Sequence, residues 1–244
     1  MHPKYGHGFV TAIGALSYSE MEEYQTMFDT MSVSSAALSK VDAIVSVINA
    51  GRNQYQQIES ATGVPWYFIG LIHHMESNND FTKHLHNGDP LTARTVHVPV
   101  GRPVDGQPPF SFYESAVDAI HYQQSVGNWD NDFSISGMLY KLEMYNGFGY
   151  RNVSPPINSP YLWAGTNYYS SGLFTADHVY SPSAVSNQIG TAAILKRLLQ
   201  TGNSDNPSQQ ADTSITSTSF GITTLSSAGL LIMAGFAYLL LFDD

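Results

Sequence analysis

The spacing of apolar residues in the first part of the chain predicts helices. Between residues 34 and 61, apolar side chains recur every three or four positions, at Leu38, Val41, Ile44, Val45 and Ile48. An α-helix turns once in 3.6 residues, so this spacing places them on one helical face. Pro65 is suited to a first helical turn, and it introduces a second, more apolar helix that ends near Glu76.

Capping residues and periodicity predict two further helices. Ser111 and Glu114 have the spacing of a capping box, in which each side chain bonds the backbone N–H of the other residue. They begin a helix through residues 116–124. Another helix is expected over residues 136–145, with Leu139 and Leu142 directed inward.

Proline and glycine mark the remaining boundaries. Ser-Pro pairs at 159–160 and 181–182 each place an N-cap serine before a proline at the first helical position. Residues 92–103 alternate in polarity and end in Gly and Pro, a pattern typical of a small β-hairpin. The sequence therefore predicts a mainly α fold of the α+β kind, with a helical bundle and one small β-hairpin.

The C-terminal part of the chain differs in composition from the rest. Residues 222–242 are uncharged and mostly apolar, and as a helix they would span ~31 Å, enough to cross a bilayer core. The polar stretch 201–221 before them is expected to be a flexible linker. Residues 34–200 then form the folded domain, and residues 1–33 are expected to be an N-terminal arm.

Charge and cysteine content exclude several classes of function. The chain of 244 residues carries a net charge of −10, and only Lys196 and Arg197 are adjacent bases. Nucleic acid is therefore not an expected partner, because binding to phosphates requires a basic surface. Cysteine is absent, so disulfides, cysteine-ligated metals and thiol nucleophiles are excluded.

Glu76 is the residue with the clearest chemical potential. It ends a helix whose other residues are nearly all apolar. Apolar surroundings disfavour the carboxylate anion, and so does the negative end of the helix dipole, so both are expected to raise the Glu76 pKa. A carboxyl group that stays protonated near neutral pH can donate a proton to the leaving oxygen of a sugar. An ordinary exposed glutamate at a helix end is the alternative.

An ordered set of motifs surrounds this residue. Gly63-Val64-Pro65 precedes the apolar helix, which ends in Met75-Glu76-Ser77. Tyr145-Asn146-Gly147-Phe148-Gly149 and Ser159-Pro160-Tyr161-Leu162-Trp163 follow later. In this order the motifs resemble those of the lysozyme-like superfamily, which includes goose-type lysozymes and soluble lytic transglycosylases. Residues 60–198 are also similar to phage and bacterial proteins called the lysozyme family, through segments 84–95, 114–119 and 145–151.

The resemblance implies roles for particular residues. Glu76 would be the general acid of a lysozyme-like catalytic domain, and the hairpin would form one wall of its cleft. Tyr145 and Asn146 would bind the glycan, and Gly147 would allow close backbone approach. Tyr161 lies where the family has a tyrosine-containing helix. Gly147 departs from the family pattern, which more often has alanine there, so the resemblance leaves the subfamily open.

The second catalytic group is left open by the sequence. A hydrolase needs a second carboxylate, whereas a lytic transglycosylase uses the sugar's own 6-hydroxyl. Asp89 and Glu143 are the candidates, Asp89 beside the expected hairpin and Glu143 on an apolar helix. Asp80 is a weaker candidate that fits a cap after the helix. His86 and Thr95 are candidate sugar-binding side chains.

Four histidines lie within fourteen residues, at positions 73, 74, 84 and 86. A zinc site is conceivable there, but no His-Glu-x-x-His motif is present and no carboxylate has clear ligand spacing. We expect no metal and no cofactor, and we keep a zinc hydrolase as an alternative.

The resemblance, together with the position of Glu76, implies an enzyme that cuts the β-1,4 bond between N-acetylmuramic acid and N-acetylglucosamine in peptidoglycan. A lytic transglycosylase is favoured over a muramidase, because no second carboxylate stands out in the sequence. The expected partners are peptidoglycan glycan strands and, through residues 222–242, a lipid bilayer. The expected location is the membrane of a phage virion, where other virion proteins are candidate partners; the rival location is a bacterial inner membrane, facing the periplasm. The alternative function is a non-catalytic glycan-binding or structural virion protein with the same fold.

Overall fold

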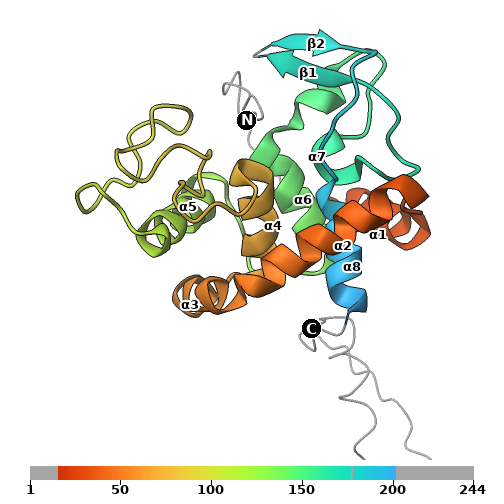
Figure 1. Cartoon of the computed structure of the whole chain (residues 1–244). Helices are drawn as coiled ribbons and strands as arrows, with labels where there is room; N and C mark the ends of the chain where they lie inside the picture. The colour runs from red at the N-terminus through yellow and green to blue at the C-terminus, as the bar shows by residue number, and fades with distance from the viewer. Residues whose placement is uncertain (1–15, 177, 202–244) are drawn as a thin grey trace, which may run out of the picture.

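The computed structural model describes residues 16–176 and 178–201, and it is mainly helical with one small antiparallel sheet (Figure 1). This confirms the expected mainly helical fold with a small antiparallel sheet, although the sheet lies at a different place in the chain. The elements in chain order are α1 (Tyr18–Thr30), α2 (Ser35–Ala50), α3 (Arg52–Thr62), α4 (Trp66–Ser77), α5 (Phe112–Val126), α6 (Ile135–Asn146), the 3-10 helix η1 (Phe148–Asn152), α7 (Pro160–Trp163), β1 (Leu173–Ala176), β2 (Val179–Ser181) and α8 (Thr191–Gln200).

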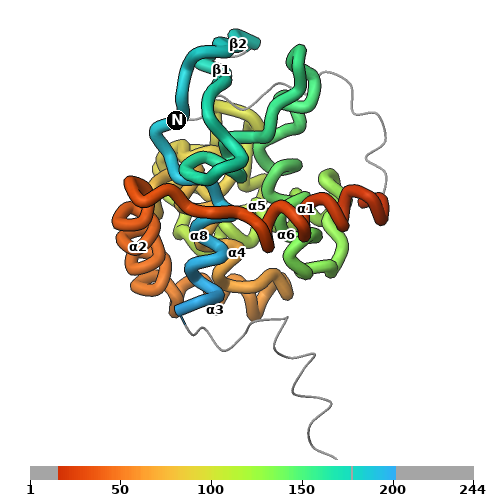
Figure 2. The backbone as a smooth tube through the Cα atoms, turned by 90° about the vertical axis from the view of Figure 1, so that its right-hand side faces the viewer, coloured from red at the N-terminus to blue at the C-terminus, as the bar shows by residue number. Residues whose placement is uncertain are grey.

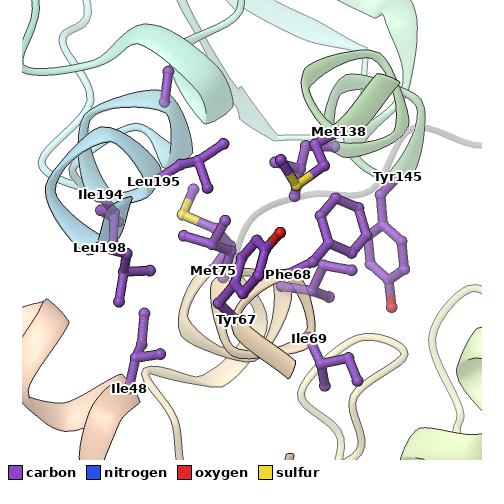
Figure 3. Close-up of a cluster of buried hydrophobic side chains, with 14 of the residues drawn as sticks. Ile48, Tyr67, Phe68, Ile69, Met75, Met138, Tyr145, Ile194, Leu195 and Leu198 are labelled. Carbon is purple, nitrogen blue, oxygen red and sulfur yellow. The ribbon is translucent and has the colours of Figure 1, made fainter. Parts of the chain in front are cut away.

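Helix α4 lies at the centre of the core. Nearly every side chain of α4 is buried, which explains why its sequence is apolar all round rather than on one face. Helices α2, α3 and α8 pack around it. Figure 3 shows Met75 of α4 close to Leu195 of α8, and Phe68 of α4 facing Met138 and Tyr145 of α6. The helix that carries Glu76 is therefore fixed from several sides.

The predicted helix over residues 34–61 is divided into α2 and α3 at Gly51. The backbone of Gly51 is approached closely by two aromatic rings. A Cβ there would lie 2.7 Å from the Tyr55 ring and 2.9 Å from the Phe81 ring. A larger residue would therefore force the rings apart. The periodicity shows both helical segments but not the turn between them, because the ring contacts are tertiary.

Most predicted helix boundaries are confirmed. Ser111 and Glu114 form a complete capping box at the start of α5. Helix α6 begins one residue before the expected range, and Pro160 opens α7 after Ser159. The second Ser-Pro pair was predicted wrongly: Ser181 ends strand β2, where it pairs with Leu173. Ser181 therefore ends a strand and does not cap a helix.

The hairpin predicted over residues 92–103 is also wrong. These residues form turns without a strand, and the sheet is built by β1 and β2 instead. Buried Thr95 organises the turns, because its hydroxyl donates to the Pro99 carbonyl at 2.5 Å and accepts from the Arg102 N–H at 2.9 Å. Pro99 and Pro103 lack the N–H that a strand ladder requires.

Helix α1 lies within the stretch that was expected to be an N-terminal arm. Tyr24 and Phe28 of α1 are buried in the core, and α1 packs against α6. Figure 2 shows α1 crossing the molecule beside α6. The folded core therefore begins at α1 and not at residue 34.

The expected membrane helix, residues 222–242, lies outside the described residues. So does the expected linker over residues 201–221, apart from Thr201, and so do residues 1–15 of the expected arm. Within the described ranges, none of the helices has the length and apolarity that a bilayer crossing requires.

Candidate functional site

Glu76 lies in the last turn of α4 and is half-buried. The helix ends at Asn78, which adopts the left-handed conformation and returns its backbone N–H to the end of the helix. The Tyr161 hydroxyl of α7 donates to Glu76 Oε1 at 3.4 Å. A carboxyl group on the central helix thus meets a phenol from a segment 85 residues later in the chain.

Two buried tyrosines face Glu76. Burial raises the pKa of Tyr161 well above its ordinary value, and the negative charge of Glu76 raises it further. The same two causes raise the pKa of Tyr145 on α6. Both phenols therefore remain protonated donors. Tyr145 donates to the Leu85 carbonyl at 2.8 Å, so it ties α6 to the loop that follows α4.

Two residues that the sequence analysis assigned no role support the end of α4. Gly88 has a φ of 76°, and a Cβ there would lie 2.4 Å from the Glu76 carbonyl oxygen. Only glycine allows this loop to rest on the backbone of Glu76. From the other side, Gln188 Nε2 donates to the Met75 carbonyl at 3.4 Å. The Asn-Gly pair at 87–88 was a turn signal, but no sequence pattern indicated Gln188.

Asn146 and Gly147 lie at the end of α6. Asn146 is buried, and its side-chain nitrogen has no hydrogen-bond partner in the described part of the chain. Gly147 has a φ of 93° and returns its N–H to the Glu143 carbonyl at 2.8 Å. The positive φ at the end of α6 thus accounts for a glycine at position 147.

Asp89 is buried and holds a loop. Its Oδ2 accepts from the backbone N–H groups of Val96 at 2.8 Å and His97 at 3.0 Å. Its Oδ1 accepts from the His97 ring at 2.6 Å. Burial opposes ionisation of Asp89, but these hydrogen bonds outweigh it and lower the pKa below its ordinary value. Its oxygens are therefore committed to the loop, although Asp89 follows the glycine that touches Glu76.

Thr95 and His86 also support this loop. Both hydrogen-bonding functions of the Thr95 hydroxyl are used within the turns over residues 95–102. His86 is buried, and its Nε2 donates to Asp118 Oδ2 at 2.8 Å. Asp118 also accepts two hydrogen bonds from Arg102, at 2.8 and 2.9 Å. The structure thus connects the loop to α5 through His86 and Arg102.

Glu143 forms an ion pair away from these contacts. Its two oxygens accept from Arg151 at 3.0 and 3.1 Å, and the Tyr24 hydroxyl of α1 donates to it as well. Burial and the charge of Glu143 together raise the pKa of Tyr24. Sequence reasoning missed this group because its members lie 119 and 8 residues from Glu143.

The four clustered histidines each bond other protein groups, although the rings of His84 and His86 lie only 5.8 Å apart. His73 contacts Tyr55 at 2.8 Å, and His74 contacts Asn79 at 3.1 Å. His84 lies 2.8 Å from the Ser115 hydroxyl. Across residues 16–176 and 178–201, no three histidines or carboxylates gather as metal ligands.

Comparison with known protein families, with curated proteins and with solved structures found no match for this chain. The site offers one half-exposed carboxyl group and a phenol that orients it. Asp89 is held by the loop at Val96 and His97, and Glu143 lies apart with Arg151 and Tyr24.

Proposed function

We propose that this protein is a lysozyme-like enzyme that cleaves peptidoglycan glycan strands, with Glu76 as the general acid. The observation that carries the proposal is the meeting of Glu76 with Tyr161, beside Tyr145. The resemblance in sequence assigned roles to these three residues, which are far apart in the chain. Their convergence at the end of one buried helix supports that assignment.

In the proposed reaction, Glu76 in its protonated form donates its proton to the glycosidic oxygen as the bond to the sugar breaks. The positive charge that builds on the sugar ring is then close to a new carboxylate. The Tyr161 hydroxyl holds the carboxyl group in one orientation, which reduces the entropy lost in reaching the transition state. The Glu76 carboxylate next takes a proton from the attacking hydroxyl and returns to its starting state.

The attacking hydroxyl is proposed to be the 6-hydroxyl of the muramic acid itself, which makes the enzyme a lytic transglycosylase. A muramidase would need a second carboxylate to act on water or on the sugar. Asp89 is held by three hydrogen bonds, and Glu143 is held by Arg151 and Tyr24. Neither is free to serve without breaking these contacts.

The proposed setting is a membrane. Residues 222–242 would anchor the enzyme in the membrane of a phage virion, or in a bacterial inner membrane facing the periplasm. An anchored enzyme has a high effective concentration at the wall. This compensates for a net charge of −10, which does not favour binding to an anionic polymer.

The test compares the full chain in mild detergent with Glu76→Gln on purified peptidoglycan, and mass spectrometry reads the products. We expect muropeptides with a 1,6-anhydro ring from the wild type and at least a ~100-fold lower rate from Glu76→Gln. Glu22→Gln is the matched control, because Glu22 is exposed on α1 and undergoes the same change of side chain.

Each other outcome changes the proposal. Products with reducing ends identify a muramidase, and Asp89 then becomes the next position to vary. If the folded wild type releases nothing, the enzyme proposal fails and a glycan-binding or structural virion protein takes its place. Activity that is lost with a chelator and restored by zinc indicates the zinc hydrolase.

A further inference from the structure

A pocket of about 240 Å³ lies beside α1, separate from the contacts of Glu76. One stripe of α1 forms a wall of this pocket, through Glu20, Glu23, Tyr24 and Met27, which are spaced to share a helical face. The other walls come from the end of α6, from η1 and from residues 156–163.

The charge of the pocket favours a cation. Arg151 lines it, but bonds from Arg151 to Glu143, Glu20 and Tyr24 use four of its five N–H groups. Glu23 also lines the pocket, and its carboxylate has no partner among the described residues. Three carboxylates therefore surround one guanidinium that is already neutralised.

Ser159 provides a second, independent observation. It is only 2% exposed, and its hydroxyl has no hydrogen-bond partner in the part of the chain that the structure describes. The N–H groups of Leu162 and Trp163 bond the Ser159 backbone carbonyl instead of its side chain. A buried hydroxyl without a partner costs free energy, so a ligand that donates to it would gain from filling the pocket.

The remaining wall is apolar. Met27, Ile157 and Trp163 line the pocket. These side chains suit a short aliphatic stem, while Glu23 and Ser159 offer oxygens to the group at its end. We propose that this pocket binds the primary ammonium group of a lysine-like side chain.

The source of this side chain is proposed to be the peptide that peptidoglycan carries, and this choice rests on the proposed function. Two elements connect the pocket to Glu76. On α6, Glu143 lines the pocket and Tyr145 lies near Glu76; at α7, Trp163 and the N-cap Ser159 line the pocket, while Tyr161 bonds Glu76. Residues two positions apart point to opposite sides of a helix, so the pocket and Glu76 lie on opposite sides of α6, one helix diameter of ~10 Å apart. Four extended residues of a peptide attached to a bound glycan span ~13 Å, enough to reach the pocket.

The test measures binding by calorimetry, with the full chain in mild detergent. The probe is Nα-acetyl-lysine amide, and Nα-acetyl-norleucine amide is the same stem without the ammonium group. We expect the lysine probe to bind about tenfold more tightly, and Glu23→Gln to remove that advantage. Glu22→Gln, one position away on the outer face, should leave it unchanged. Ser159→Ala should weaken binding about threefold.

Equal binding of the two probes, or equal effects of Glu23→Gln and Glu22→Gln, overturns the ammonium site. The source is tested with a disaccharide-peptide bearing a free amine, its acetylated form, and an unrelated lysine-containing peptide. The free amine should bind most tightly; an unrelated peptide that binds equally well overturns the peptidoglycan source. Specific lysine binding without glycan cleavage means that the proposed enzyme fails while the ammonium site stands. Cleavage of glycan without a preference for the lysine probe means that the proposed enzyme stands while the ammonium site fails.

Discussion

The Tyr161 hydroxyl orients one oxygen of Glu76, and it can be removed without changing the shape of the ring. We expect Tyr161→Phe to lower the rate of glycan cleavage by about 10- to 100-fold, because an unoriented carboxyl group donates its proton less often. Initial rates on purified peptidoglycan measure this. Tyr113→Phe, at an exposed position of α5, is the control and should keep the full rate.

Both variants should unfold at nearly the same temperature as the wild type. A Tyr161→Phe protein that cleaves at the wild-type rate would show that the hydroxyl does not position Glu76.

His73 links stability to pH at the scale of one side chain. Burial lowers its pKa from 6.5 to about 4, so the folded protein holds the ring neutral. The unfolded chain binds a proton below pH 6.5, so stability is complete above that value and falls as the pH drops towards 4. We expect protonation of the unfolded chain at His73 to lower the free energy of unfolding by about 2 kcal/mol between pH 7 and pH 4.5, as measured by urea unfolding.

His73→Gln separates this effect from the others. It keeps a polar side chain near Tyr55 but does not titrate, so its stability should depend less on pH in that window. Burial also lowers the pKa of His74, which therefore leaves part of the slope. An unchanged slope in His73→Gln would assign the whole effect to other groups.

At the scale of elements, the loop after α4 rests on the helix end through Gly88. We expect Gly88→Ala to destabilise the protein by about 3 kcal/mol, from a positive φ and from contact with the Glu76 carbonyl. Gly63→Ala is the matched control, because Gly63 has nearly the same φ but open space at its Cβ position. Gly63→Ala should lower the free energy of unfolding by only about 1 kcal/mol.

Chemical unfolding gives both values, and activity adds a second measurement. Because Gly88 contacts the backbone of Glu76, Gly88→Ala should also lower the cleavage rate of the protein that remains folded. Equal losses of stability in the two variants would mean that the loop moves away without strain.

The sequence predicted the elements whose causes are local. The capping box at Ser111 and the apolar helix ending at Glu76 depend on neighbouring residues, so they were found. Residues 92–103 alternate like a strand, but the hydroxyl of Thr95 and the carboxylate of Asp89 bind their backbone into turns. No hydrophobic pattern reveals such side-chain bonds.

The same distinction applies to the candidate site. Glu76, Tyr145 and Tyr161 were named from motifs, and the structure brings them together. Asp89 and Glu143 were named because they are carboxylates near those motifs. Their engagement with His97 and with Arg151 depends on the tertiary arrangement of side chains, which motif spacing does not give.

At the scale of the whole molecule, the proposed anchor predicts membrane binding. The full chain should float with vesicles of zwitterionic lipid, and a chain lacking residues 222–242 should stay in solution, because the apolar run is then absent. A chain lacking residues 201–221 loses the same number of residues and should still float. Flotation of the chain without residues 222–242 would place the membrane contact elsewhere.

The partners of Glu76 come from distant parts of the chain, and this has a consequence for biosynthesis. A nascent chain carries Glu76 long before it carries Tyr161, and Gln188 follows later still. Helix α8, which packs on α4, is the last described element to be translated. The proposed acid is therefore assembled only after α8 has been translated. A product truncated before α7 would carry the glutamate without Tyr161 and Gln188, and we expect it to lack the proposed activity.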